Sequence, residues 1–415
     1  MYDAEIADHA QNGSGPGFVR YTRSEFEKLR RQHNILALVG NGFDIQTLAD
    51  YEHPIDSRYE TFYYYLQMRG FNSRNLLLMQ MNYELRLHQQ FGGHDSWSDI
   101  EAAVERNLKY PHAPGRIFDD LRAMQAEFAQ FLQGVAPSTL LDQVGVDAAK
   151  NGLSLRSLAE FLGDVVDRDD FLTLDFPSRV SHYDLFNFQF VNFNYTTLLD
   201  NYIYLDQVQF DPLKHRTVDT NFTFRNDPRS YRKPGATPDE GYSGYVVSDV
   251  IHPHGVLSTP RSLLFGIDAP DDYKQQARND ARRLEKPYWS QAHALYRNHF
   301  LQADLFVIFG CSLGQSDGWW WRNIVRGLRN TKSQTPTRGA NKGQTLEEFS
   351  ELIIYRRQED GRHSVDSVRD RFLDVAGVSA VDPDRQWLAD RIHVVIYDDS
   401  TDRAFLNTRR QRDPG

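Results

Sequence analysis

The sequence predicts an α/β fold of the Rossmann-like type, with a mostly parallel sheet flanked by helices and a large helical insertion. Short apolar runs of four to seven residues recur along the chain and alternate with segments of helical periodicity. Two of these runs end in glycine turns, Gly40-Asn41-Gly42 and Gly310-Cys311-Ser312. The segment 55–180 mostly follows the helical pattern. Strands buried on both faces and joined by helices are typical of a parallel sheet.

The elements follow in order from the N-terminus. Residues 1–18 end in QNGSGPGF, which predicts a flexible arm, and the wholly apolar run 35–39 predicts a buried strand. Apolar residues at helical spacing predict helices through most of 55–180, and YTTLLDNYIYL predicts another after residue 194. Further strands are expected at 186–194, 262–265, 303–310, 351–355 and 391–397, and surface loops at 226–244 and 332–345.

These elements suggest a division of the chain into four parts. After the arm 1–18, residues 19–54 and 181–400 form the Rossmann-like core, 55–180 the helical insertion, and 401–415 a polar C-terminal tail. The length of 415 residues suits one large domain with insertions, or two domains.

Composition excludes several functions. The net charge of −10 argues against a nucleic-acid binder, which usually has a basic surface. No apolar run approaches the ~18 residues that a membrane span needs, and the acidic N-terminus lacks the apolar segment of a signal peptide. The single cysteine, Cys311, allows no intrachain disulfide and no cysteine-based zinc module. We therefore expect a cytoplasmic protein without direct contact to nucleic acid or membrane.

Polar residues follow the predicted strands directly. In a parallel sheet the carboxyl ends of the strands share one edge, where ligands bind. If the sheet is parallel, these residues converge there: Gly40, Asn41, Gly42, Asn194, Gly266, Asp268, Gly310, Ser312, Asp398 and Asp399.

The segment GNGFD (40–44) supports two interpretations. Its glycines leave backbone room for a diphosphate at a helix N-terminus, and Asp44 could then meet a ribose hydroxyl. Alternatively it is a tight strand-to-helix turn in which Asp44 is the helix N-cap.

Asn194 and the pair His252 and His254 also leave alternatives. Asn194 could hold a water or a sugar hydroxyl, or could simply be a turn asparagine. A histidine suits general-base chemistry, and two at this spacing could bind a metal. With no clear third ligand nearby we predict no metal, and the other alternative is a turn with one buried ring.

Two more segments have mainly structural interpretations. In GCSLGQSDGWWW (310–321), Ser312 could meet a ribose or phosphate and Asp317 could cap the following helix. We expect at least one tryptophan of 319–321 to pack outward, against another element or a partner chain. In WSDIE (97–101), Ser98 and Glu101 have the spacing of a capping box, with Trp97 as a packing anchor.

The order of these motifs resembles the AbiH family of phage abortive-infection proteins. GNGFD, WSDIE, FNYT, HG and GCSLGQSD follow one another across roughly residues 35–320. The order is more distantly similar to the SIR2 fold. That resemblance implies a SIR2-type sheet that binds NAD, with Gly40, Asn41 and Gly42 at the diphosphate and Phe43 covering the cofactor. It places the SIR2 asparagine at Asn194, the histidine at His254 and the ribose serine at Ser312.

Two departures from the sirtuins argue against deacetylation. The alanine and serine residues of the sirtuin glycine turn are absent, and a four-cysteine zinc module cannot form with Cys311 alone. The resemblance implies instead an NAD⁺ hydrolase that yields nicotinamide and ADP-ribose, with Asn194 and His254 catalytic and Asp44 and Asp268 as secondary candidates.

A defence role of this kind implies control by assembly. We expect a homo-oligomer or a companion such as an ATPase or a phage-derived trigger. The alternatives are a non-catalytic NAD or ADP-ribose sensor or scaffold, and a transferase or cyclase.

Overall fold

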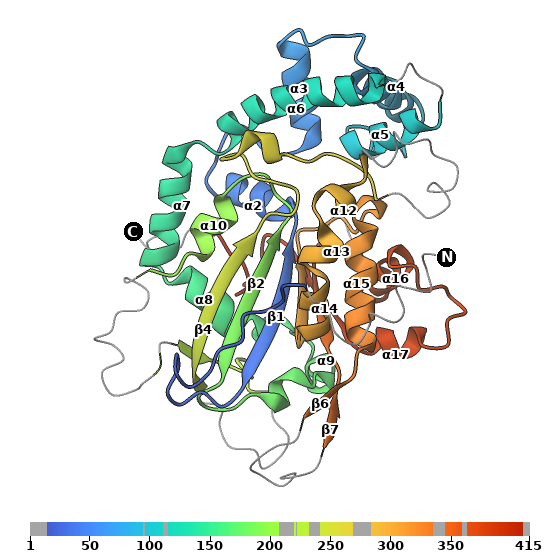
Figure 1. Cartoon of the computed structure of the whole chain (residues 1–415). Helices are drawn as coiled ribbons and strands as arrows, with labels where there is room; N and C mark the ends of the chain where they lie inside the picture. The colour runs from blue at the N-terminus through green and yellow to red at the C-terminus, as the bar shows by residue number, and fades with distance from the viewer. Residues whose placement is uncertain are drawn as a thin grey trace.

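The computed structural model describes residues 15–93, 96–110, 115–206, 220, 222–231, 241–268, 284–334, 345–358 and 363–409. Its centre is a seven-stranded sheet in the order β3-β4-β2-β1-β5-β8-β9 (Figure 1). Six of the strands are parallel, and across the sheet they run third, second, first, fourth, fifth, sixth in chain order. This is the doubly wound order of the Rossmann fold, so the predicted fold class is confirmed.

The strands have these bounds. The parallel ones are β1 (Gln32–Val39), β2 (Leu185–Asn192), β4 (Tyr242–Ile251), β5 (Leu305–Phe309), β8 (Glu351–Arg357) and β9 (Ile392–Tyr397). The short β3 (Phe222–Phe224) is antiparallel to β4, while β6 (Lys332–Gln334) and β7 (Leu346–Glu348) form a separate two-stranded ribbon.

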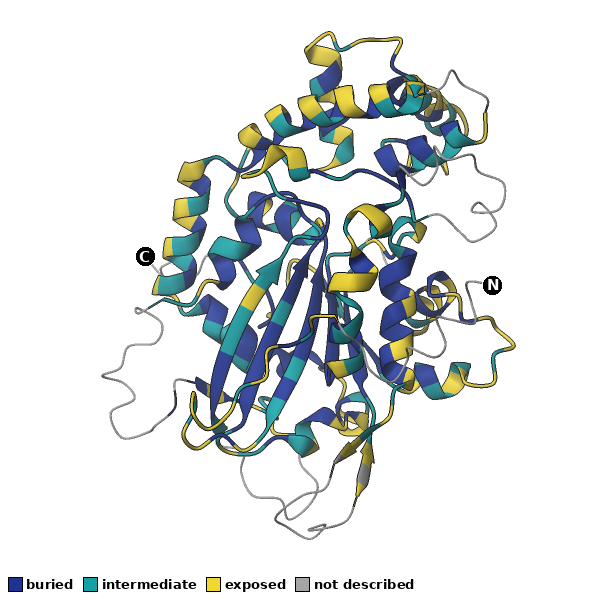
Figure 2. Ribbon diagram, viewed as in Figure 1, coloured by how far each residue is buried: buried dark blue, intermediate teal, exposed yellow. Residues whose placement is uncertain are grey.

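The apolar run of β1 explains why both faces of the sheet are covered. Its side chains alternate between two hydrophobic clusters: Ile35, Ala37 and Val39 lie in one, Leu36 and Leu38 in the other. All five are at most 1% exposed, and the neighbouring strand β5 is buried along its whole length (Figure 2). A strand that is apolar on both faces stabilises a layer of helices on each side.

Helices lie on both faces of the sheet and beyond its carboxyl edge (Figure 1). Beyond that edge stand α3 (Tyr59–Met68), α4 (Leu76–Phe91), α5 (Ile100–Leu108) and α6 (Arg116–Val135). The others are α2 (Gly42–Asp50), α7 (Ser138–Lys150), α8 (Leu153–Glu160), α9 (Arg168–Thr173), α10 (Leu198–Ile203), α12 (Lys286–Trp289), α13 (Ala292–Leu295), α14 (Arg297–Gln302), α15 (Gly318–Arg329), α16 (Val365–Val375) and α17 (Arg385–Ala389).

The expected helical insertion therefore has two structural roles. Helices α3 to α6 stand over the carboxyl edge, whereas α7 packs against α10 and α8 packs against β3 at the flank of the sheet. One hydrophobic cluster runs from the sheet into α3 and α6 without a break, through residues such as Phe62 and Phe128. The insertion and the sheet thus share a core.

Several predicted elements are wrong. Residues 262–265 are not a strand; they follow a single 3₁₀ turn, and the carbonyl of Leu263 accepts a hydrogen bond from Gln125 of α6. The predicted loops 226–244 and 332–345 also overlap strands β4 and β6. Polar residues in those strands hid them: β4 is only partly buried although it pairs with strands on both sides, and β6 consists of Lys332, Ser333 and Gln334.

Both chain ends are more buried than their composition predicts. Residues 1–14 lie outside the described part of the chain, but Phe18 is 9% exposed and its amide donates to Gln302 of α14. In the predicted polar tail, Phe405 and Leu406 are fully buried. A short apolar triplet, 404–406, is enough to return the chain to the core.

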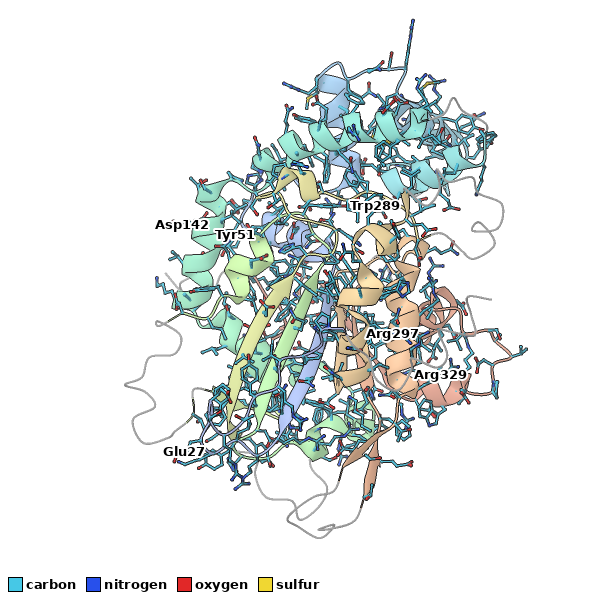
Figure 3. The ribbon with its side chains drawn as sticks, in the orientation of Figure 1. Glu27, Tyr51, Asp142, Trp289, Arg297 and Arg329 are labelled. Atoms are coloured by element: carbon cyan, nitrogen blue, oxygen red, sulfur yellow. The ribbon has the colours of Figure 1, made fainter. Side chains whose placement is uncertain are left out.

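Charged side chains occupy the outer surface of the flanking helices. Asp142 and Arg329 point outward from α7 and from the end of α15 (Figure 3).

Among the described residues, no helix is long and apolar enough to span a membrane.

Candidate functional site

The carboxyl ends of β1, β2, β4 and β5 meet at one edge of the sheet, as a parallel sheet requires. The two glycine turns lie side by side there. A Cβ on Gly42 would lie 2.6 Å from the Cα of Gly310, and one on Gly310 would lie 2.8 Å from the amide nitrogen of Phe43. Gly310 also has φ +67°, which favours glycine. The glycines are needed for this close approach.

The glycine-turn amides are largely bonded within the protein. The amide of Gly40 donates to Phe309 O at 2.8 Å and that of Gly42 donates to Gly310 O at 2.9 Å. The side chain of Asn41 exchanges hydrogen bonds with Ser57. These two glycine amides therefore do not point at a diphosphate.

Phe43 and Asp44 both face inward. The ring of Phe43 is fully buried between Tyr202 and Phe309, so it packs in the core and does not cover a cofactor. Asp44 is 1% exposed and lies inside α2, whose N-cap is Asn41. The alternative in which Asp44 is the N-cap is therefore wrong.

Asp44 and Asn194 form a buried polar pair. The amide of Asn194 donates to Asp44 Oδ1 at 2.8 Å and to Gly40 O at 3.2 Å, while Thr196 donates to Asp44 Oδ2 at 2.6 Å. Burial raises the pKa of Asp44 to about 7, against the opposing effect of the Thr196 and Asn194 hydrogen bonds. Asn194 thus joins the end of β2 to the turn after β1.

The two histidines have different surroundings. His252 bonds the carbonyl of Asn194 at 3.2 Å and the carboxylate of Asp200 at 2.9 Å. His254 is 3% exposed, stacks on Phe193 at 5.1 Å, and has Nε2 3.8 Å from Asp317 Oδ1. Each histidine therefore lies beside a carboxylate, and His254 is the more buried of the two.

A buried ion cluster continues from His254. The ammonium of Lys286, 4% exposed, lies 2.6 Å from Glu101 Oε1 and 3.1 Å from Asp317 Oδ1. Glu101 comes from α5 of the insertion, Lys286 from the start of α12, and Asp317 from the loop after β5. Three distant parts of the chain thus meet at one buried ammonium group.

Burial and charge set the protonation of this cluster. Burial and Lys286 lower the pKa of His254 to about 3, against the attraction of Asp317. Burial also raises the pKa of Glu101, although Lys286 opposes it. Burial disfavours ionised Asp317, but Lys286 and His254 outweigh it and hold the pKa of Asp317 below its usual value. At neutral pH, His254 is an unprotonated base beside a carboxylate.

The remaining predicted residues lie at the rim of the same edge. Asp268 pairs with Arg322 at 2.6 Å, and a Cβ on Gly266 would lie 2.3 Å from Leu284 O. Ser312 is exposed just after β5. Nearby, Arg356 donates to the carbonyl of Cys311 at 3.5 Å.

Sequence reasoning missed Lys286 and misjudged Glu101 and Asp317. The N-cap of α5 is Asp99, which accepts from the amides of Glu101 and Ala102, so the expected Ser98 capping box is wrong. Asp317 makes no cap hydrogen bond, because its carboxylate turns to Lys286. The available signal was the two acidic residues Glu101 and Asp317 themselves. The cation that they share, Lys286, lies far from Glu101 in the sequence.

The tryptophans have structural roles. Trp97 packs edge-on against Tyr63 and is the expected anchor. Trp319, Trp320 and Trp321 are all buried, because α13, α14 and α16 cover α15 where the sheet does not. Trp321 also donates to Gly314 O at 2.9 Å, which holds the loop that carries Asp317. No partner chain is needed to bury this run.

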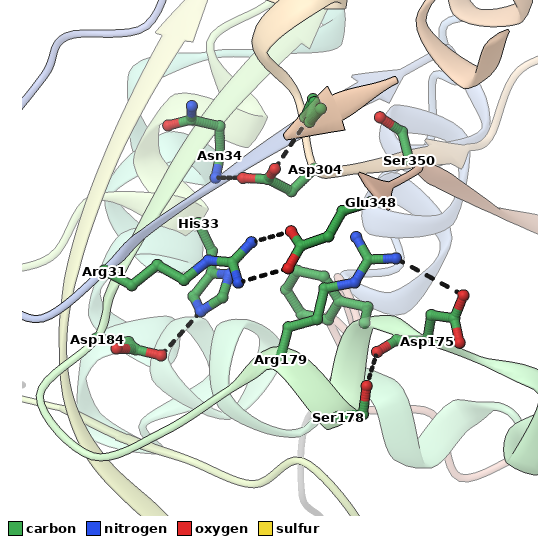
Figure 4. A network of polar contacts seen from close by, with 12 residues as sticks. Arg31, His33, Asn34, Asp175, Ser178, Arg179, Asp184, Asp304, Glu348 and Ser350 are labelled. Atoms are coloured by element: carbon green, nitrogen blue, oxygen red, sulfur yellow. Dashed lines mark hydrogen bonds and ion pairs between the residues drawn. The ribbon is translucent and has the colours of Figure 1, made fainter. Parts of the chain in front are cut away.

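A second polar network lies at the opposite, amino edge of the sheet (Figure 4). His33 Nε2 is 2.9 Å from Asp184 Oδ2, and both side chains are fully buried. Arg31 pairs there with Glu348 through two hydrogen bonds. This network joins the starts of strands and offers matched controls for the carboxyl edge.

Two cavities among the described residues lie away from the central edge. One, of about 460 Å³, lies at the starts of β8 and β9, and the other, of about 300 Å³, lies between α7 and α10 and includes Asp200. Within the described ranges, no three His, Cys, Asp or Glu side chains are grouped so as to hold a metal ion.

Fold and site together define a Rossmann-like α/β protein with a buried acid–base cluster at the carboxyl edge of its sheet, completed by a helical insertion. The family model described as "Bacteriophage abortive infection AbiH" matches residues 36–336. The chain therefore belongs to the AbiH family of phage abortive-infection proteins. No curated protein and no solved structure matches it.

Proposed function

We propose that this AbiH-family chain is a SIR2-like NAD⁺ hydrolase that acts as an effector of anti-phage defence. The observation that carries the proposal is that Asn194 and His254 both lie at the carboxyl edge of a doubly wound sheet, just after β2 and β4. The ring of Phe193, next to Asn194, stacks directly on His254. Such an edge is where open α/β sheets bind nucleotides.

In the proposed reaction, the bond between ribose C1′ and the nicotinamide nitrogen breaks, and its electron pair stays on the nitrogen. A water oxygen bonds to C1′, and His254 takes the proton of that water. His254 is neutral at neutral pH, and Asp317 at 3.8 Å stabilises the imidazolium that forms. The products are nicotinamide and ADP-ribose.

The other proposed contacts are adjusted to the geometry. Since the amides of Gly40 and Gly42 are bonded internally, we assign the diphosphate to the exposed Ser312 and the guanidinium of Arg356. Gly310 provides the turn that places Ser312 at the rim. Asp268 and its partner Arg322 remain candidates for ribose contact.

A non-catalytic sensor or scaffold is the second candidate. It is favoured by the burial of Asn194 and His254, at 4% and 3% exposed, and by cavities that lie elsewhere. A binding module needs affinity for NAD or ADP-ribose but no reacting water.

Turnover of NAD by the pure protein separates these candidates. Nicotinamide and ADP-ribose in equal amounts support hydrolysis, cyclic ADP-ribose or a transferred ADP-ribose supports the cyclase or transferase, and binding without products supports the sensor. Several protein concentrations are needed, because the proposed enzyme is controlled by assembly or by a companion.

We expect Asn194→Ala and His254→Ala each to abolish NAD cleavage while the protein stays folded. General-base assistance is worth ~10²–10⁴ in rate, so His254→Ala should lose at least that much. The measurement is the initial rate of nicotinamide release.

The matched controls come from the amino edge. His33→Ala removes another buried histidine beside an aspartate, and Asn187→Ala removes another buried asparagine of β2. Both should retain turnover. His252 is a poor control, because it contacts the carbonyl of Asn194. Wild-type rates in both Asn194→Ala and His254→Ala would contradict the proposed site.

A further inference from the structure

Lys286 is a buried cation shared by two carboxylates from different parts of the fold. Its ammonium lies 2.6 Å from Glu101 of α5 and 3.1 Å from Asp317 of the loop after β5. Removing one partner of a buried ion group leaves the remaining charges uncompensated, which is destabilising. The three charged groups therefore depend on one another.

Backbone hydrogen bonds connect both His254 and Lys286 to the same segment, residues 264–267. The amide of Leu264 donates to His254 O at 2.8 Å, and the amide of Lys286 donates to Ile267 O at 2.9 Å. Ile267 and Glu285 also form an isolated parallel bridge. The segment that follows β4 therefore fixes both the histidine and the lysine.

We propose that Lys286 is a positioning residue that holds Asp317 beside His254 and joins this pair to Glu101 of the helical insertion. The proposal deepens the proposed function, since it assigns the insertion a part in the state of the proposed base. The contacts on which it rests do not depend on the identity of the substrate.

The charges around His254 define what each group contributes. Lys286 lowers the pKa of His254 and Asp317 raises it, while burial lowers it most. Glu101, Asp99 and Tyr195 surround Lys286 and Asp317 rather than His254 itself. Lys286 therefore affects the pKa of His254 in two ways. Its own positive charge lowers this pKa, and its ion pair with Asp317 weakens the effect of the Asp317 carboxylate on His254.

The test is an NMR titration of the histidine side chains in the full chain, with the His254 signal assigned by its loss in His254→Asn. In wild type, His254 should stay neutral from pH 8 down to pH 5, in keeping with a pKa of about 3. In Lys286→Met the pKa of His254 should rise toward its ordinary value, because the positive charge of Lys286, which lowers this pKa, is removed. Lys286→Arg, which keeps the charge, should restore the wild-type titration.

Lys332→Met is the matched control. Lys332 is another largely buried lysine, 3.0 Å from Asp304 at the amino edge of the sheet. It should leave the His254 titration unchanged. An unchanged His254 titration in a folded Lys286→Met protein would overturn the proposal.

If Lys286→Met fails to fold, the double variant Glu101→Met/Lys286→Met carries the same test. Replacing both partners of a buried pair with apolar groups is often neutral for stability, and Asp317 is still left with His254. The same rise in the pKa of His254 is expected, and an unchanged titration overturns the proposal.

Turnover of NAD is a separate arm. If wild type cleaves NAD, Lys286→Met should change kcat far more than it changes KM, because Lys286 acts on the proposed base and not on the bound substrate. If wild type does not cleave NAD, the proposed hydrolase is contradicted, whereas the titration still decides the role of Lys286.

Discussion

The partners of a side chain, as much as its burial, set the protonation of single residues at the carboxyl edge. Burial disfavours the ionised form of both Asp44 and Asp317, yet the pKa of Asp44 is raised to about 7 and that of Asp317 is lowered. The difference lies in their partners: Asp44 accepts hydrogen bonds from the neutral Asn194 and Thr196, whereas Asp317 pairs with Lys286. A neutral donor compensates burial less than a cation does.

We expect Asp44→Asn to weaken the pH dependence of stability. Because the folded chain binds this proton more tightly than the unfolded chain, the contribution of Asp44 is present below about pH 4 and is lost as the pH rises through about 7. The free energy of unfolding should therefore fall between pH 5 and 8 in wild type by on the order of a few kcal/mol more than in Asp44→Asn.

Denaturant unfolding at several pH values measures this effect. Asp249→Asn removes an exposed carboxylate of β4 and should keep the wild-type dependence. If the free energy of unfolding changes equally with pH in Asp44→Asn and in wild type, the expected effect of burying Asp44 is contradicted.

The N-cap of helix α5 leaves a neighbouring side chain available for the candidate site. Asp99 caps α5 by accepting from two amides at 2.8 and 3.1 Å. Ser98 is therefore not needed as a cap, and Glu101 is free to reach Lys286.

Loss of the α5 cap should be visible in stability. We expect Asp99→Ala to lower the free energy of unfolding by about 1 kcal/mol, the usual cost of a lost N-cap. Ser98→Ala should leave it within about 0.5 kcal/mol of wild type. Thermal or denaturant unfolding compares the two variants. A larger loss of stability in Ser98→Ala than in Asp99→Ala would contradict the assignment of Asp99 as the cap and support Ser98 instead.

The molecule as a whole closes through its C-terminal segment. The carboxylate of Asp164 accepts from the amides of Ala404 and Phe405 at 2.7 and 2.9 Å. The ring of Phe405 stacks on Tyr355 of β8 at 5.1 Å. The segment after β9 thus covers the sheet and is part of the core.

Truncation of Phe405 should therefore be costly. We expect Phe405→Ala to lower the free energy of unfolding by about 3–5 kcal/mol, because a fully buried phenyl ring leaves a cavity. Val381→Ala, at a side chain that is 90% exposed, is the control and should be near neutral. Similar losses in the two variants would contradict the packing of this segment.

Assembly is expected to involve the outer surface of the insertion. Large apolar side chains are exposed on α3 and α4, among them Tyr64, Met68 and Tyr83 at 49%, 81% and 56%. We expect a homo-oligomer or a complex with a companion protein, as measured by light scattering with and without co-encoded proteins. A monomeric mass at micromolar concentration in both samples would count against it, and Met68→Lys should shift an assembled sample toward monomer.

Local pattern was sufficient to predict the parallel sheet, the run of helices in 55–180, and the edge that Asn194 shares with the two glycine turns. Periodicity and strand-end motifs report such features, because each is encoded within a few neighbouring residues. The triplet 404–406 and β4 escaped the same reasoning, since short or partly polar segments carry little periodic signal.

Tertiary structure alone decided which polar groups share the site. Glu101, Lys286 and Asp317 are separated by long stretches of chain, and only the folded insertion brings them to one ammonium group. Likewise, the contact of Gly42 with Gly310 exists only because β1 and β5 are neighbours in the sheet. Charges and close contacts depend on distance in space, and spacing along the chain does not reveal which distant residues burial will pair.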